Sequence, residues 1–137
     1  MAVKMTLQYA GQLRCQLAHG PSGVSIETDA PVDNAGRGES FSPTDLVGAA
    51  LLSCAVTTMA IKAPQAGLQF TRATGSIEKH MTAAPPRRIA RLVMTLELPA
   101  ATPLADRPGL EAIARSCPVA LSLGADVEVE TRFVYGS

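Results

Sequence analysis

The chain has 137 residues, a length that suits one compact domain spanning 1–137. Apolar residues make up 47% and charged residues 18%, which supplies enough apolar side chains for a core and excludes intrinsic disorder. Twelve basic residues balance twelve acidic ones, aromatic residues are only 4%, and Trp is absent. This composition argues against binding to nucleic acid or to an anionic membrane surface.

The cysteine count and the N-terminal pattern indicate a reducing compartment. Three cysteines are too few for a secreted disulfide scaffold. Residues 1–9 alternate polar and apolar side chains and lack the apolar run of a signal peptide. The longest uncharged stretch, residues 46–61, is 16 residues long, shorter than the roughly 20 residues that cross a bilayer. We therefore expect a cytoplasmic protein with no membrane partner, whose cysteines are reduced unless they take part in chemistry.

The first third of the chain predicts strands. Apolar and polar residues alternate over 3–9, as in a half-buried strand. A second strand over 13–19 places Cys15 on the same face as its apolar neighbours, so we expect Cys15 to lie in the core. A short third strand is expected over 24–28. Residues 29–40 are rich in Gly, Pro, Asp and Asn and predict a loop.

The strongest local signal begins at Ser42. Serine is a preferred N-cap, and Pro43 suits the first position of a helix. Asp45 follows Ser42 by three residues and takes the place of the usual Glu in a capping box. A helix is predicted from Pro43 to about Lys62. Because uncharged residues run all round it, we expect it to be buried on most sides.

The remaining elements complete an α+β order with mostly antiparallel pairing, βββ-α-ββ-α-β. The residue before a proline disfavours the helical conformation, so Cys117-Pro118 is predicted to interrupt the second helical region. The expected elements are strands over 68–82 and 89–98 joined by a hairpin connection over 83–88, helical segments over 109–116 and 118–123, and a final strand over 127–135.

Two cysteines are candidates for chemistry. Cys54 lies inside the apolar helix, where a free cysteine is commonly a buried packing residue. Cys117 stands at the helix interruption and is a candidate N-cap of the restarted helix, where backbone N–H groups favour a thiolate. Both a packing role and a chemical role remain open for this residue on local pattern alone.

The sequence contains no motif for a metal or a bound cofactor. Cys15 and His19 share a strand face, but local motifs do not assemble four zinc ligands, so we expect no metal site. His80 is expected to be a surface histidine. Glycine-rich phosphate-binding patterns and a nucleophile elbow are both absent from the sequence, so no cofactor is expected.

Two segments resemble the signatures of the OsmC/Ohr family, the osmotically inducible and organic hydroperoxide resistance proteins. Residues 41–54 resemble the first signature, in which a Pro precedes a Cys by eleven residues with an Ala-rich helix between them, as Pro43 and Cys54 do. Cys117-Pro118 after a short helix resembles the second. With similar central-hairpin and N-terminal segments, the resemblance covers essentially the whole chain.

The resemblance implies a fold and an activity. The fold would be an intertwined homodimer, with antiparallel sheets around a buried central helix and active sites at the subunit interface. Cys54 would be the peroxidatic residue and Cys117 the resolving one, in an enzyme that reduces small organic hydroperoxides during oxidative or osmotic stress. An external dithiol would then reduce the disulfide. The alternative is a non-catalytic dimer that binds a small apolar ligand or a partner.

The sequence departs from this pattern directly after the signature proline. Peroxidase members carry a Glu there, paired with an Arg that supports the thiolate, whereas this chain has Thr44 followed by Asp45. Asp45 is therefore a candidate catalytic acid, and its alternative role is the capping box with Ser42. Arg14 is the favoured partner. The other candidate arginines are Arg37, Arg87 and Arg88.

Overall fold

The computed structural model describes residues 1–136, and their contacts divide the chain into two compact units. The first unit is Met1–Val47, and the second begins at Gly48. Helix α1 (Pro43–Gln65) starts in the first unit and continues through the second. The single domain expected from chain length stays a prediction.

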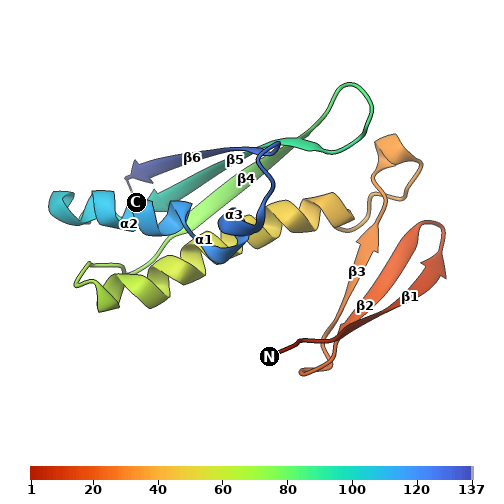
Figure 1. The fold of residues 1–137 in the computed structure, drawn as a ribbon, viewed down its shortest axis with the longest axis horizontal. Coiled ribbons are helices and arrows are strands. Elements are labelled where there is room, and N and C mark those ends of the chain that lie inside the picture. Colours follow the sequence, from red (N-terminus) through yellow and green to blue (C-terminus); the bar gives the residue numbers. More distant parts are fainter. Residues whose placement is uncertain (137) are drawn as a thin grey trace. The chain divides into compact units, whose positions relative to one another are not determined.

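The first unit is built on a three-stranded antiparallel sheet in the order β1-β2-β3 (Figure 1). The strands are β1 (Met5–Gly11), β2 (Arg14–His19) and β3 (Ser25–Asp29), which confirms the three strands predicted. Leu13 was expected inside the second strand but instead forms the β1–β2 turn with Gln12, and φ is positive at both residues. Two left-handed residues give a tight hairpin turn that matches the twist of its strands.

The apolar side chains of this sheet remain largely open to solvent. Met5, Leu7 and Ile26 are exposed in the single chain, and Cys15 is only half-buried. The expectation that Cys15 lies in the core is therefore wrong. The first unit adds only a short 3-10 turn (Val32–Asn34) and the start of α1 to its sheet, which is too little chain to cover both faces.

The second unit has a sheet in the order β4-β5-β6, formed by β4 (Thr74–Met81), β5 (Ile89–Leu98) and β6 (Glu128–Tyr135). β4 and β5 form an antiparallel hairpin, but β6 runs parallel to β5. Pairing among the described strands is thus mostly antiparallel, as expected, and the β5–β6 ladder is the exception. The chain leaves β5, passes through helical segments and returns in the same direction, as parallel pairing requires.

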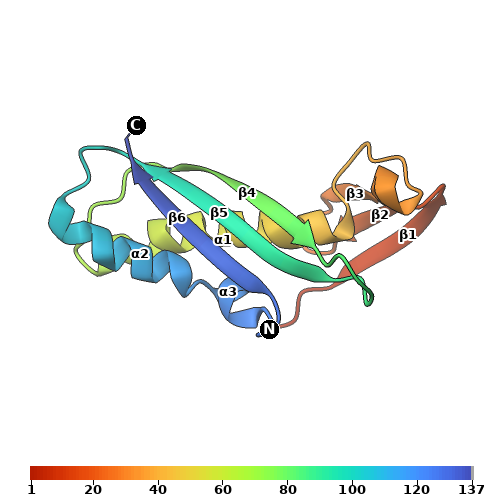
Figure 2. The same cartoon turned by 90° about the horizontal axis from the view of Figure 1, so that it is seen from above.

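Helices cover one face of this second sheet (Figures 1 and 2). The chain between β5 and β6 contains a 3-10 turn (Leu104–Asp106), α2 (Arg107–Arg115) and α3 (Pro118–Ser122). These bounds confirm the two predicted helical segments and the break at Cys117. The strand expected from residue 68 begins only at Thr74, since Leu68 and Phe70 pack against the core outside the sheet. Together the elements form an α+β fold.

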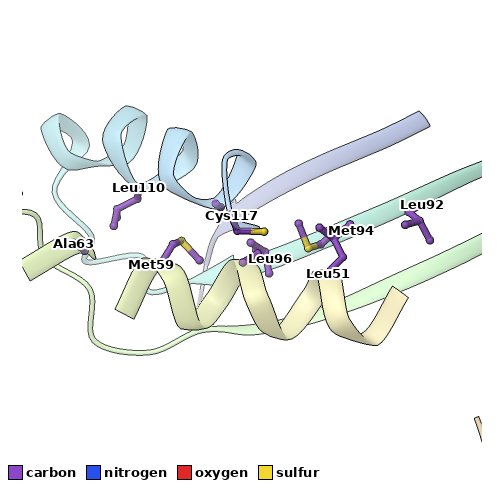
Figure 3. Close-up of a cluster of buried hydrophobic side chains, with 10 residues drawn as sticks. Leu51, Met59, Ala63, Leu92, Met94, Leu96, Leu110 and Cys117 are labelled. Carbon is purple, nitrogen blue, oxygen red and sulfur yellow. The ribbon is translucent and has the colours of Figure 1, made fainter. Parts of the chain in front are cut away.

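One stripe of α1 forms the centre of the core of the second unit. Leu51, Ala55 and Met59 are fully buried against apolar residues of β5 and α2, including Leu96 and Leu110 (Figure 3). The remaining faces of α1 are half-buried or exposed, so the helix is not buried on most sides in the single chain. By length and composition α1 could also cross a membrane, but its buried stripe packs as in the core helix of a globular protein.

A reciprocal capping box starts α1, as the sequence predicts. The backbone N–H of Asp45 donates to Ser42 Oγ at 3.0 Å, and the N–H of Ser42 donates to the Asp45 carboxylate at 2.9 Å. Both contacts satisfy N–H groups that the first turn of a helix leaves without helical partners. They hold the segment that leads into the apolar part of α1.

The buried position of Leu110 gives a test of this core. Leu110→Ala should lower the free energy of unfolding by about 3 kcal/mol, because it leaves a cavity between α2 and α1. Leu104→Ala is the matched control, since Leu104 is 77% exposed in the neighbouring 3-10 turn. Urea denaturation of both variants measures the difference. Equal destabilisation would contradict the assignment of Leu110 to the core.

Candidate functional site

The second unit brings Cys54 and Cys117 together. Cys54 lies in the middle of α1, and Cys117 is the N-cap of α3 at the break after α2. The two thiols share a hydrogen bond. In Figure 3 the Cys117 side chain lies between α1 and the α2–α3 break, close to Leu96 and Met59. The pair is therefore held by the same packing that forms the core.

The Cys54 thiol has an environment that favours its thiolate. Burial is the largest single influence and opposes ionisation, but three hydrogen bonds together outweigh it and lower the pKa of Cys54. The donors are the backbone N–H of Val119, the hydroxyl of Thr58 and the thiol of Cys117. The Thr58 Oγ1 to Cys54 Sγ distance is 3.8 Å. Cys54 is half-buried, which leaves part of its side chain accessible.

Cys117 has the opposite character. It is fully buried, and this burial is the main reason that its pKa is raised. The backbone N–H groups of Ala120 and Val119 act in the other direction, but the hydrogen bond to Cys54 and the charge of an ionised Cys54 raise the pKa further. The helix-cap position was expected to favour a Cys117 thiolate. The structure shows that burial overrides this effect.

The two thiols therefore differ in role. A thiolate is the reactive form of cysteine, so Cys54 is the better nucleophile, while Cys117 stays protonated and donates to it. Sulfur atoms within hydrogen-bonding distance can join in a disulfide with little backbone movement. The arrangement can thus support attack by one thiol followed by closure of a bond to the other.

Arg14 belongs to the first unit, where it forms a partly buried ion pair. Its guanidinium donates two hydrogen bonds to the Asp29 carboxylate, at 2.7 and 2.8 Å, and a third to Glu39 at 3.2 Å. The Asp29 side chain is fully buried, and the bond from Arg14 is the main cause of its lowered pKa. Asp29 also accepts the backbone N–H of Glu39 at 3.1 Å. Arg14 thus ties β2 to β3 and to the following loop.

Asp45 also lies in the first unit, where its carboxylate caps α1. The cysteine pair lies in the second unit. Catalytic roles for Arg14 and Asp45 therefore stay predictions, whereas the pairing of Cys54 with Cys117 is part of the geometry of one unit.

Arg37, Arg88 and His80 each have interaction partners other than the two thiols. Arg37 bonds Gln12 and approaches Glu39 within the first unit. Arg88 donates to two backbone carbonyls, that of Ile89 at the start of β5 and that of Asp126 just before β6. His80 is half exposed on β4 beside Glu78, as expected for a surface histidine. Residues 1–136 hold no group of three or more His, Cys, Asp and Glu side chains able to bind a metal.

Sequence reasoning missed two contributors to the site. Thr58 follows Cys54 by four residues, a spacing that places both on one side of a helix, so its contact was detectable from sequence. Val119 contributes its backbone N–H because Cys117 caps α3. The cap was predicted, but only tertiary packing shows that this N–H reaches the other cysteine.

A cavity of about 260 Å³ lies in the second unit, and one of its wall residues is Ala120, whose backbone N–H bonds Cys117. Its walls come from α1, β5, α2, α3 and β6, and they are mostly apolar. The lining residues are Leu51, Met94, Ala114, Arg115, Ala120, Val129 and Thr131.

The different environments of the two thiols predict their order of alkylation. In the reduced protein at neutral pH, iodoacetamide should modify Cys54 faster than Cys117, because only the thiolate reacts and the pKa of Cys54 is lowered whereas that of Cys117 is raised. Peptide mass spectrometry after timed quenching resolves the two sites. Unfolding in urea should equalise the rates, and equal rates in the folded protein would contradict the assignment.

The Arg14–Asp29 pair predicts an acid dependence of stability. The pKa of Asp29 lies below its ordinary value of 3.8 in the folded chain, so its stabilising contribution is present above 3.8 and is lost as pH falls through the lower folded value. Asp29→Asn should lower the denaturation midpoint at pH 7 and weaken its dependence on acid. Asp33→Asn, at an exposed position in the same loop, is the control and should change neither.

Comparison with known proteins finds a protein family that matches this chain. The family of OsmC-like proteins, OsmC, matches residues 36–132. A Psychrobacter arcticus protein, provisionally described as an osmotic stress induced and detoxification response protein, has a solved structure that is 34% identical. It superposes with a TM-score of 0.86 over 94% of this chain and 93% of that one. No curated protein sequence matches this chain.

Two more distant structures share the fold alone. An organic hydroperoxide resistance protein OsmC from Legionella pneumophila is 14% identical, with a TM-score of 0.80 over 98% of this chain and 97% of its own. An organic hydroperoxide resistance protein from Elizabethkingia anophelis is 13% identical, with a TM-score of 0.78 over 98% and 96%. The family match over most of the length and the 34% identical relative agree with the two cysteine signatures, and the chain belongs to the OsmC family.

Proposed function

We propose that this protein is a thiol-dependent peroxidase that reduces organic hydroperoxides with Cys54 and Cys117. The observation that carries the proposal is the hydrogen-bonded pair of thiols whose pKa values are displaced in opposite directions. The Cys54 thiol ionises more readily and can attack the peroxide, while the buried Cys117 thiol stays protonated beside it. Structural neighbours named organic hydroperoxide resistance proteins support the same choice of activity.

In the first step the Cys54 thiolate attacks the terminal oxygen of the hydroperoxide. A sulfur–oxygen bond forms and the oxygen–oxygen bond breaks, so Cys54 becomes a sulfenic acid. The alkoxide takes a proton from water and leaves as an alcohol. Sulfur supplies the two electrons that the peroxide gains.

In the second step the Cys117 sulfur attacks the sulfenic sulfur of Cys54. The sulfur–sulfur bond forms, the sulfur–oxygen bond breaks, and water leaves with the thiol proton of Cys117. An external dithiol then reduces the disulfide by thiol–disulfide exchange and is itself oxidised. This cycle uses no metal and no bound cofactor.

Other features of the proposal rest on the family resemblance. The enzyme would act in the cytoplasm as a homodimer during oxidative or osmotic stress. Arg14 and Asp45 would support the thiolate if the assembled protein brings them to Cys54. The exposed apolar residues of the first sheet and the one-sided burial of α1 are what a second chain would cover.

Cumene hydroperoxide provides the test of this cycle. Added in equimolar amount to the reduced protein, it should remove two thiols per chain and link Cys54 to Cys117, as peptide mass spectrometry can show. Cys54→Ser should abolish the rapid reaction. Cys117→Ser should stop at a Cys54 sulfenic acid that dimedone traps.

Cys15→Ser is the matched control for these variants. Cys15 takes no part in the proposed cycle, so its loss should leave formation of the Cys54–Cys117 disulfide unchanged. The proposal fails if wild-type Cys54 reacts with the peroxide no faster than free cysteine.

A second candidate function is binding of a small apolar ligand without turnover. The mostly apolar cavity of about 260 Å³ favours it, although its size suits only a small molecule. The peroxide experiment separates the two functions, because a ligand-binding protein would give slow and scattered thiol oxidation.

A further inference from the structure

The hydroxyl group of the Thr58 side chain forms a hydrogen bond with the sulfur of Cys54. Thr58 lies one turn further along α1, on the same side of the helix, and it is 7% exposed. Its hydroxyl oxygen is 3.8 Å from Cys54 Sγ, within hydrogen-bonding range for sulfur. A buried hydroxyl requires a partner, and this sulfur provides one.

This contact differs from the usual behaviour of a hydroxyl inside a helix. Such side chains commonly bond a carbonyl of the preceding turn, as Ser53 Oγ does with the carbonyl of Ala50 at 3.3 Å. The Thr58 hydroxyl instead has the cysteine sulfur as its partner. The adjacent Thr57 is exposed, so the two threonines form a natural pair of test and control positions.

Burial of Cys54 opposes its ionisation, so each hydrogen-bond donor to its sulfur matters for the stability of the thiolate. The groups of the second unit that bond its sulfur are the Val119 N–H, the Thr58 hydroxyl and the Cys117 thiol, all of them neutral. Val119 donates through its backbone N–H, which a side-chain substitution does not remove. Cys117 is itself oxidised in the proposed reaction. Thr58 is therefore the donor that a side-chain change can remove without altering the redox pair.

We propose that Thr58 is a catalytic residue that donates its hydroxyl hydrogen bond to the Cys54 thiolate and holds that sulfur ready to attack. The proposal rests on the proposed function in taking Cys54 as the attacking thiol. The contact and its effect on ionisation do not depend on which electrophile Cys54 meets.

Replacing the hydroxyl with a methyl group has two opposing consequences for rate. Thr58→Val should reduce the thiolate fraction of Cys54 about tenfold at pH values below its pKa, the effect of losing one donor to a charged acceptor. A more basic thiolate is also a stronger nucleophile. The observed rate should then fall only about threefold at low pH, while the limiting rate at high pH should rise about threefold.

The experiment measures iodoacetamide alkylation of Cys54 against pH by peptide mass spectrometry on the reduced full-length chain. Thr58→Val should move the profile to higher pH and raise its limiting rate. Thr58→Ser keeps the hydroxyl and should retain the wild-type profile, and Thr57→Val should match the wild type. A merely structural role of Thr58 would not raise the limiting rate.

Two results would overturn the proposal. One is an unchanged profile in Thr58→Val, and the other is a shift in Thr58→Ser as large as that in Thr58→Val. Circular dichroism checks that each variant is folded, and if Thr58→Val does not fold, Thr58→Ala takes its place with the same expectations.

A parallel measurement with cumene hydroperoxide keeps the two proposals separate. If Thr58→Val shifts the alkylation profile but wild-type Cys54 does not reduce the peroxide, the peroxidase function fails and the role of Thr58 in activating the thiol stands. If the peroxide is reduced with equal pH dependence in both proteins, the peroxidase stands and the role of Thr58 fails.

Discussion

The packing of α1 against β5 and α2 is the constraint on which the thiol pair depends. Cys54 lies on a helix whose buried stripe is fixed against the sheet, and Cys117 ends the segment that covers the same stripe. Proline at 118 prevents α2 from continuing through this point. The chain therefore turns over α1 and places a buried sulfur against a half-buried one. A change in the register of either helix would separate the two atoms.

Within this arrangement the electrostatics follow from a balance between burial and hydrogen bonding. Burial disfavours both thiolates, but only Cys54 receives enough donors to overcome it. The donors within its unit are neutral, so they act at contact distance, where solvent ions screen little. The Arg14–Asp29 pair shows the contrasting case. There the buried Asp29 carboxylate accepts two hydrogen bonds from the Arg14 guanidinium within the first unit, which ties that cation to local structure.

The errors of sequence reasoning have a common physical origin. Alternation in strands correctly located the sheet of the first unit but predicted that Cys15 is buried, because it reports which residues share a face and not whether anything covers that face. The parallel direction of β6 depends on how the connecting helices cross the sheet, which periodicity does not contain. The apolar composition of α1 likewise indicates a tendency to be buried, whereas the single chain supplies partners for only one side.

The local chemistry of the chain was readable from its residues. Ser42 and Asp45 specify the start of α1, Pro118 specifies the helix break, and the two cysteine signatures indicate the family, because caps, breaks and spacings act over a few neighbouring residues. Tertiary structure alone decided which sulfur receives the Val119 N–H and which becomes fully buried. These properties depend on contacts between α1 and a segment far away in sequence, and their balance sets which cysteine ionises first.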